Sequence, residues 1–183
     1  MSGTQTGASR AQAAARGLEK LDLDFIAYVP SNTIAPIINH FRELASETAL
    51  RAFPVSREEE AVGIIGAVSL AGKRGAIVMQ DNGFGNAMTA LATFAVAYHR
   101  PLLIVANTRG GLGEYNSMIH TISEAAPKML EEIGIPVFRL DRRDDPVDWE
   151  ATIYEAGRHA GMTHRPVVVL MDFWSGAAGR TER

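Results

Sequence analysis

Short apolar segments that alternate with helical patterns are the feature that most constrains how this chain folds. Six such segments are rich in β-branched or aromatic residues and are bounded by turn residues: 24–29, 50–55, 75–80, 101–106, 136–140 and 166–171. Several are apolar at every position, as in AIVM, LLIV and VVVLM, which is typical of strands buried on both faces of a parallel sheet. The alternation predicts an α/β fold, a doubly wound, mostly parallel six-stranded sheet with helices on both faces.

Helical patterns fill the intervals, over 8–20, 33–46, 57–71, 85–99, 122–133 and 148–160. Two of these helices follow a Ser or Thr that has Glu three residues later, the pattern of a capping box: Ser56 with Glu59, and Thr121 with Glu124. Pro127 could kink the second of these helices or delay its start.

The length of 183 residues, without an evident linker or repeat, predicts one domain over 1–183 with loose tails at about 1–8 and 175–183. The absence of Cys excludes disulfides, thiolate zinc sites and cysteine nucleophiles. A net charge of −3 argues against a nucleic-acid partner. The longest mostly apolar stretches are shorter than a membrane span, and the first residues do not form a secretory signal, so we expect a cytoplasmic protein with no membrane partner. The His residues lack metal-ligand spacing, and we expect no metal site in this chain.

Ligands of doubly wound sheets bind beyond the carboxyl ends of the strands. One segment at this edge, 57–60, contains three consecutive Glu residues at a helix start. Glu59 is assigned to the capping box, and Glu60 points to roughly the opposite helix face from Glu58. Glu58 is therefore the carboxylate left to point across the edge. The alternative is a solvated Glu58 that is favoured only by the helix dipole.

A second segment, 80–86, is a glycine-containing turn from strand to helix. Gly83 and Gly85 allow close backbone approach to a ligand, and the following helix start offers N–H donors. The segment lacks the third glycine of the dinucleotide fingerprint and the Lys of a P-loop, which disfavours a nucleotide phosphate. A tight turn without a ligand is the alternative.

A third segment, 107–120, is a long connection of the kind that is often functional. Arg109 is either a binder of an anionic substrate group or a solvated loop charge. His120 is either an acid–base group or a surface histidine.

Four segments carry a resemblance to a known family: VSREEEAVGIIGAVSLAGK, IVMQDNGFGNAMTALATF, PLLIVANTRGGLGE and AAPKMLEEIGIPVFRL. Over about residues 22–171 the chain resembles the pyrimidine-binding domain of thiamin-diphosphate-dependent 2-oxoacid decarboxylases. The likeness is greatest to sulfopyruvate decarboxylase α subunits and next to phosphonopyruvate decarboxylases. In that family the first glutamate of the helix start hydrogen-bonds a ring nitrogen of the cofactor's aminopyrimidine. The resemblance assigns this role to Glu58, with Glu59 as the second choice.

The resemblance also implies roles for residues in the other segments. The family's Met-Gln-Asn-Ser-Gly-Leu-Gly-Asn is matched with its glycines and final Asn kept, but Asp81-Asn82 replaces Asn-Ser. The residues implied to contact the cofactor are Gly83, Gly85 and Asn86. Those implied to face the substrate are Ser31, Asn32, Arg109 and His120, the last also as a proton-transfer group.

The family's second domain, which holds the cofactor's diphosphate through Mg²⁺, carries a Gly-Asp-Gly sequence that this chain lacks. The resemblance therefore implies a hetero-oligomer in which a β subunit binds the diphosphate and Mg²⁺. The implied reaction is decarboxylation of an anionic 2-oxoacid of the sulfopyruvate type to an aldehyde and CO₂. Two alternatives are open: phosphonopyruvate or another 2-oxoacid as substrate, or a non-catalytic α/β module that binds a metabolite.

Overall fold

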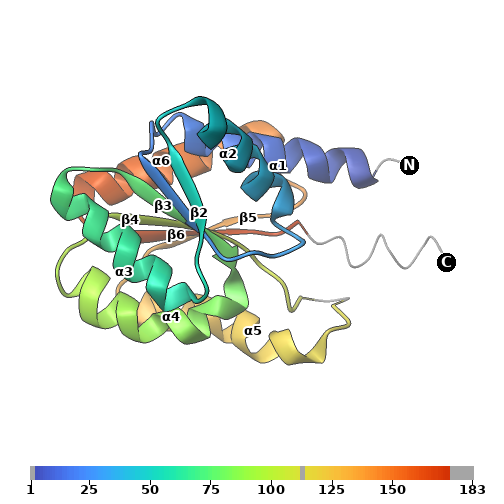
Figure 1. The fold of residues 1–183 in the computed structure, drawn as a ribbon. Coiled ribbons are helices and arrows are strands. Elements are labelled where there is room, and N and C mark those ends of the chain that lie inside the picture. The colour runs from blue at the N-terminus through green and yellow to red at the C-terminus, as the bar shows by residue number, and fades with distance from the viewer. Residues whose placement is uncertain (1–2, 112–113, 174–183) are drawn as a thin grey trace.

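A computed structural model describes residues 3–111 and 114–173 and contains one six-stranded sheet (Figure 1). The strands are β1 (Phe25–Tyr28), β2 (Arg51–Pro54), β3 (Gly75–Gln80), β4 (Leu102–Asn107), β5 (Val137–Leu140) and β6 (Pro166–Met171). Their order is β2-β1-β3-β4-β6-β5, and every pair is parallel. The predicted sheet is confirmed, with each strand end within one or two residues of its expected place.

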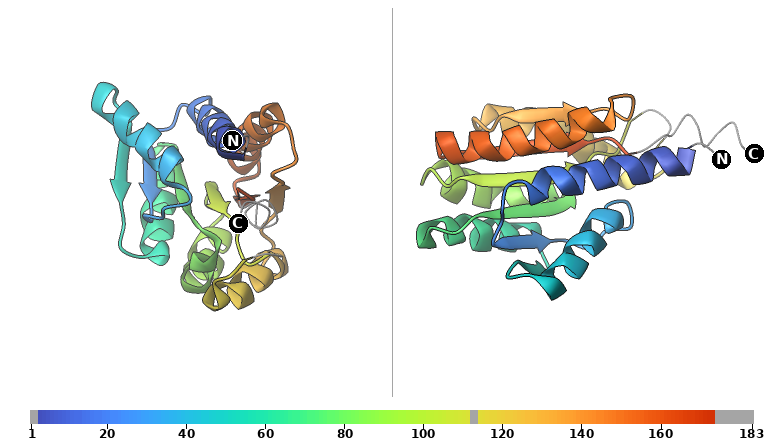
Figure 2. Two further views of the ribbon diagram at one scale, coloured as in Figure 1. Left: turned by 90° about the vertical axis from the view of Figure 1, so that its right-hand side faces the viewer. Right: turned by 90° about the horizontal axis from the view of Figure 1, so that it is seen from above.

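Helices cover both faces of the sheet, as predicted (Figure 2). One face packs against α1 (Gly3–Glu19), α2 (Ala35–Glu47) and α6 (Pro146–Thr163). The other face packs against α3 (Glu58–Val68), α4 (Phe84–Ala90) with its continuation η3 (Leu91–Val96), and α5 (Ser117–Glu132). Two short 3₁₀ turns complete the set, η1 (Ser69–Ala71) and η2 (Asp81–Gly83). Within the described ranges, no helix is both long enough and apolar enough to cross a membrane.

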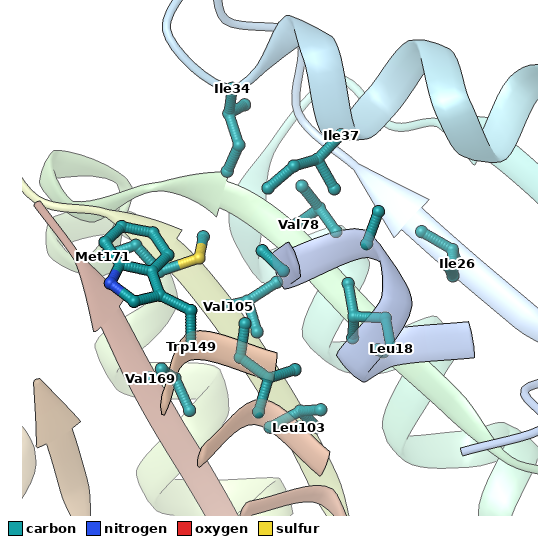
Figure 3. Packing of buried hydrophobic residues seen from close by; sticks show 14 of the residues in the cluster. Leu18, Ile26, Ile34, Ile37, Val78, Leu103, Val105, Trp149, Val169 and Met171 are labelled. Atoms are coloured by element: carbon teal, nitrogen blue, oxygen red, sulfur yellow. The ribbon is translucent and has the colours of Figure 1, made fainter. Parts of the chain in front are cut away.

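The central strands are buried on both faces, which explains their continuous apolar sequence. In β3, Val78 belongs to the core under α1, α2 and α6, whereas Ile77 and Met79 belong to the core under α3, α4 and α5. Figure 3 shows the first of these cores, where Val78 lies among residues of α1, α2 and the neighbouring strands. Burial of this kind stabilises the sheet by about 25 cal/mol per Å² of apolar surface.

Two helix starts differ from the prediction. The helix α1 begins at Gly3, so residues 3–8, expected to be a loose tail, are helical in the backbone; no proline interrupts them. The expected tail at 175–183 lies outside the described residues. The capping box at Thr121 is wrong, because α5 begins at Ser117, where the Asn116 side chain accepts a hydrogen bond from the Met118 N–H at 3.1 Å. The earlier start buries Ile119, and Pro127 lies inside the helix.

A close contact between α3 and η3 sets the packing of the two helices on this face. The segment η3 is a π-helix, which places one extra residue in the turn. The Phe94 ring lies over Gly66 of α3, where an added Cβ would be 2.6 Å from the Phe94 Cε1 atom. Only glycine at position 66 therefore fits beneath this ring as the helices are packed.

The strand order reverses direction at two places, between β1 and β3 and between β4 and β6. Ligand crevices of doubly wound sheets form at such places, beyond the carboxyl ends of the strands. The left view of Figure 2 looks at this edge and separates its two halves, with α3 on one side and α5 and α6 on the other.

Candidate functional site

Glu58 is the first residue of α3, and its helix is capped one residue later than the sequence suggested. Arg57 occupies the N-cap position, so the third helical residue is Glu60 rather than Glu59. The Glu60 Oε2 atom accepts a hydrogen bond from the Ser56 N–H at 3.0 Å, and the Arg57 Nε–H donates to Glu59 Oε1 at 2.5 Å. The predicted Ser56–Glu59 capping box is wrong. Glu59 and Glu60 are nevertheless both engaged near the helix start.

The half-buried Glu58 side chain lies across the turn that follows β3. The Asn86 Nδ2–H donates to Glu58 Oε2 at 2.9 Å. A Cβ added at Gly83 would be 2.4 Å from both Glu58 Cγ and Glu58 Oε1. Gly83 has an ordinary negative φ of −65°, so glycine is required here for space rather than for backbone conformation. Three of the four predicted cofactor residues thus converge; the fourth, Gly85, is exposed and nearest to Ile122 of α5.

We expect Gly83→Ala to lower any catalytic rate that depends on Glu58 at least tenfold, because the alanine methyl group would displace the Glu58 carboxylate. The Glu58 side chain is flexible, so its displacement should lower the free energy of unfolding by less than about 2 kcal/mol. Initial rates and urea denaturation of the same preparations measure the two effects. Gly161→Ala in α6 is the matched control, since an added Cβ there meets no atom within 4 Å. Equal rates for Gly83→Ala and the control would contradict the expectation.

Asp81 connects this turn to the loop that follows β4. It is fully buried, and its Oδ2 atom accepts hydrogen bonds from the Thr108 hydroxyl and the Arg109 N–H, both at 3.0 Å. Its Oδ1 atom has no hydrogen-bond partner among the described residues. Burial raises the pKa of the Asp81 carboxyl, and the hydrogen bonds from the Arg109 N–H and the Thr108 hydroxyl, together with the nearby Ser123 hydroxyl, offset only part of this effect. Asp81 therefore holds the start of the loop in place, and its ionisation in this buried position lowers the free energy of unfolding.

The raised pKa of Asp81 predicts a pH-dependent stability. A carboxyl whose pKa is higher in the folded state stabilises the fold most at acid pH, below its unfolded pKa. That stability is lost as pH rises through the folded pKa. Asp81→Asn keeps an oxygen acceptor without the charge, so its free energy of unfolding relative to the native protein should increase as pH rises from about 4. Urea denaturation between pH 4 and 8 measures this, with the exposed Glu131→Gln as control; parallel curves for Asp81→Asn and native protein would contradict it.

Arg109 forms a buried ion pair rather than a solvated loop charge. Its Nε and Nη2 atoms donate to the two carboxylate oxygens of Glu114, each at 2.9 Å. The Arg109 side chain is 15% exposed and the Glu114 side chain is 0% exposed. Burial alone would raise the pKa of Glu114, but hydrogen bonds from Arg109 and from the Asn116 N–H outweigh it and lower that pKa. The pair closes the loop on itself.

The remaining predicted residues lie around these two groups. The His120 Nε2 atom is 3.2 Å from the Glu114 carbonyl oxygen, so His120 packs with the ion pair. The Ser31 hydroxyl donates to Gln80 Oε1 at 3.3 Å, which places Ser31 where β1 and β3 diverge. Asn32 is exposed. Glu58, Gly83 and Asn86 form one cluster and Arg109, Glu114 and His120 another, with Asp81 between them.

The first cluster is suited to a planar polar heterocycle. Glu58 presents a carboxylate at a helix N-terminus, Asn86 presents an amide, and Gly83 keeps the wall flat. Among residues 3–111 and 114–173, no group of three or more His, Asp or Glu side chains is arranged to hold a metal ion. Sequence reasoning missed Asp81 and Glu114 as structural residues; a carboxylate directly after a buried strand is the signal that could have indicated Asp81.

Comparison with known sequences identifies a family and related proteins. Residues 9–126 match the family "Thiamine pyrophosphate enzyme, N-terminal TPP binding domain". The sulfopyruvate decarboxylase subunit alpha of Methanothermobacter thermautotrophicus is 30% identical over 160 residues, which cover 86% of this chain and 93% of that protein. The phosphonopyruvate decarboxylase of Streptomyces viridochromogenes is 29% identical over 104 residues, 57% of this chain and 25% of that protein.

Among solved structures, the fold matches a 2-oxoglutarate:ferredoxin oxidoreductase from Magnetococcus marinus. The TM-score is 0.75 at 17% sequence identity, over 90% of this chain and 28% of that chain. At this identity the match establishes the fold alone.

Proposed function

The chain belongs to the thiamine pyrophosphate enzymes, as an N-terminal TPP binding domain, and on this premise we propose that it is the pyrimidine-binding α subunit of a two-subunit 2-oxoacid decarboxylase. The proposed substrate is an anionic 2-oxoacid of the sulfopyruvate type, converted to an aldehyde and CO₂. The proposed place of action is the cytoplasm. The relative from M. thermautotrophicus, which is named as a subunit alpha and aligns over nearly its full length, supports this assignment.

The placement of Glu58 carries the proposal. Bound thiamin diphosphate supplies the electron sink that decarboxylation of a 2-oxoacid requires. Glu58 would accept or share a proton at the pyrimidine ring nitrogen through its carboxylate, which Asn86 orients by the 2.9 Å hydrogen bond. Gly83 would let the ring approach the turn, because no side chain stands between the backbone and Glu58. The donor set therefore fits the pyrimidine half of the cofactor.

A β subunit is the proposed partner and would hold the cofactor's diphosphate and Mg²⁺. The active site would then lie between the two subunits, with Glu58 supplied by this chain. Ser31, Asn32, Arg109 and His120 are the proposed substrate contacts. Ser31 contacts Gln80 at the end of β3, whereas Arg109 and His120 lie in the second cluster, on the loop whose start Asp81 anchors.

The proposal is tested by co-expressing the chain with the protein encoded by the neighbouring open reading frame. Thiamin diphosphate with Mg²⁺ should raise the melting temperature of the complex by several degrees and leave that of this chain alone unchanged. The complex should release an aldehyde from sulfopyruvate in a panel that includes phosphonopyruvate and pyruvate. If the complex converts phosphonopyruvate and not sulfopyruvate, the assigned substrate becomes phosphonopyruvate. No complex and no thermal shift would favour a non-catalytic binding module.

A further inference from the structure

A cavity of about 450 Å³ opens at the half of the carboxyl edge that does not hold Glu58. It lies beyond the ends of β4, β5 and β6, where the strand order reverses for the second time, and α5 forms one wall. Neither Glu58 nor Asn86 lines it. Its volume is within the range of small-molecule sites in proteins.

The side chains around this cavity are predominantly cationic. Lys128 of α5, Arg139 of β5 and Arg142 just beyond β5 lie on its walls together with Arg109. The acidic lining residues are Glu124 and Asp172, and an Arg142 Nη1 atom lies 3.7 Å from an Asp172 carboxylate oxygen. Within the described part of the chain, neither Lys128 nor Arg139 forms an ion pair. Neither of these two charges is therefore compensated by a direct ion pair with a described residue, although Glu124 and Asp172 lie on the same cavity.

A buried hydroxyl and a buried glycine of the loop complete the wall. Ser123 is 4% exposed, lines the cavity and lies near the Asp81 carboxyl, and its Oγ atom forms no hydrogen bond of standard geometry among the described residues. Gly110 has a φ of +79°, and an added Cβ would be 2.8 Å from Ser123 Cβ. Glycine thus lets the loop backbone approach α5 closely beside the Ser123 hydroxyl, and this contact keeps the wall compact.

We propose that this cavity is an anion site, which takes a small dianion with a phosphate, sulfonate or paired carboxylate group. Lys128 and Arg139 supply the charge that compensates the ligand, and Ser123 supplies a hydroxyl donor. The site does not include Glu58, and the proposal does not depend on the proposed function. The same chemistry admits two sources of ligand: a free anion that acts as an effector, or a 2-oxoacid that carries a second anionic group.

Binding of inorganic phosphate to the full chain tests the proposal at constant ionic strength. Phosphate should bind saturably in calorimetry and raise the melting temperature, whereas chloride at equal ionic strength should not. The double variant Lys128→Gln/Arg139→Gln should bind phosphate at least tenfold more weakly, a loss of about 1.4 kcal/mol. Arg42→Gln on α2, an exposed Arg on the opposite face of the sheet, is the matched control and should bind as the native chain does. Binding that is equal in the double variant, or absent in the native chain, would overturn the site.

Kinetics of the reconstituted complex distinguish the two sources. If the ligand is the 2-oxoacid, the double variant should raise KM at least tenfold without added phosphate. If the ligand is a free anion, KM should stay unchanged and the response of the rate to added phosphate should disappear. Circular dichroism of both variants checks that the fold is retained. These variants leave Glu58 intact, so failure of the anion site and failure of the proposed function give different results.

Discussion

Replacing Glu58 by Gln should lower the turnover of the assembled enzyme by about 10²- to 10⁴-fold, the range of a lost acid–base group. Gln keeps the shape of Glu and can accept the Asn86 hydrogen bond, but its amide does not share a proton with a ring nitrogen. The side chain is only half buried and its helix packs through other residues, so the melting temperature should be unchanged within about 2 °C. Steady-state rates at saturating cofactor, with thermal unfolding of the same samples, measure both effects.

The neighbouring carboxylates supply the comparison. Glu60→Gln removes a hydrogen bond to the Ser56 N–H and should leave turnover within a few fold of native. Glu59→Gln separates the two candidates that the sequence left open, because Glu59 pairs with Arg57 and not with the turn after β3. Full activity of Glu58→Gln together with loss in Glu59→Gln would transfer the role to Glu59.

Replacing Arg109 by Ala should cost about 3–5 kcal/mol of the free energy of unfolding, the loss expected when one partner of a buried ion pair is removed. The reason is that Glu114 is fully buried and would keep its charge without the two hydrogen bonds from Arg109. Urea denaturation at pH 7 measures the loss. The double variant Arg109→Ala/Glu114→Ala should recover part of it, because no unpaired charge is left behind. A loss below about 1 kcal/mol in the single variant would show that the pair does not form in solution.

This stability effect decides how substrate binding by Arg109 is tested. Arg109→Lys keeps a positive charge but gives up the bidentate geometry, so more folded protein should be recovered than with Ala. If Arg109 binds the substrate's second anionic group, Arg109→Lys should raise KM for sulfopyruvate and leave KM for pyruvate unchanged. An equal rise for both substrates would assign Arg109 to loop structure alone.

The sheet was predictable because each buried strand has a recognisable apolar pattern within its own few residues. GAIVMQ and PVVVLM form strands over the predicted residues, since continuous β-branched and aliphatic side chains fit only a strand covered on both faces. Helix ends were less predictable, because several polar residues near each end compete for the same cap. At α5 the burial of Ile119 favours Asn116 over Thr121, and this burial depends on the packed fold.

The candidate site shows the same division. Glu58 followed from its place at a helix start and from the family resemblance, although the capping argument that set Glu59 aside used the wrong cap. The Arg109–Glu114 pair was beyond sequence reasoning, because a loop charge is buried only when the loop folds back on itself. The sequence identified Asp81 only as a difference from the family pattern and predicted no structural role for it. In the structure it accepts two hydrogen bonds that connect the turn after β3 to the loop after β4.

The contact of Phe94 with Gly66 limits which substitutions the two positions can accept in related sequences. Gly66 and Glu58 are eight residues apart on one rigid helix, about 12 Å along its axis. A larger side chain at position 66 would push α3 away from η3 and tilt its other end, which moves the carboxylate although nothing near it has changed. We therefore expect positions 66 and 94 to vary together. A homologue with a larger side chain at position 66 should have a smaller one at position 94.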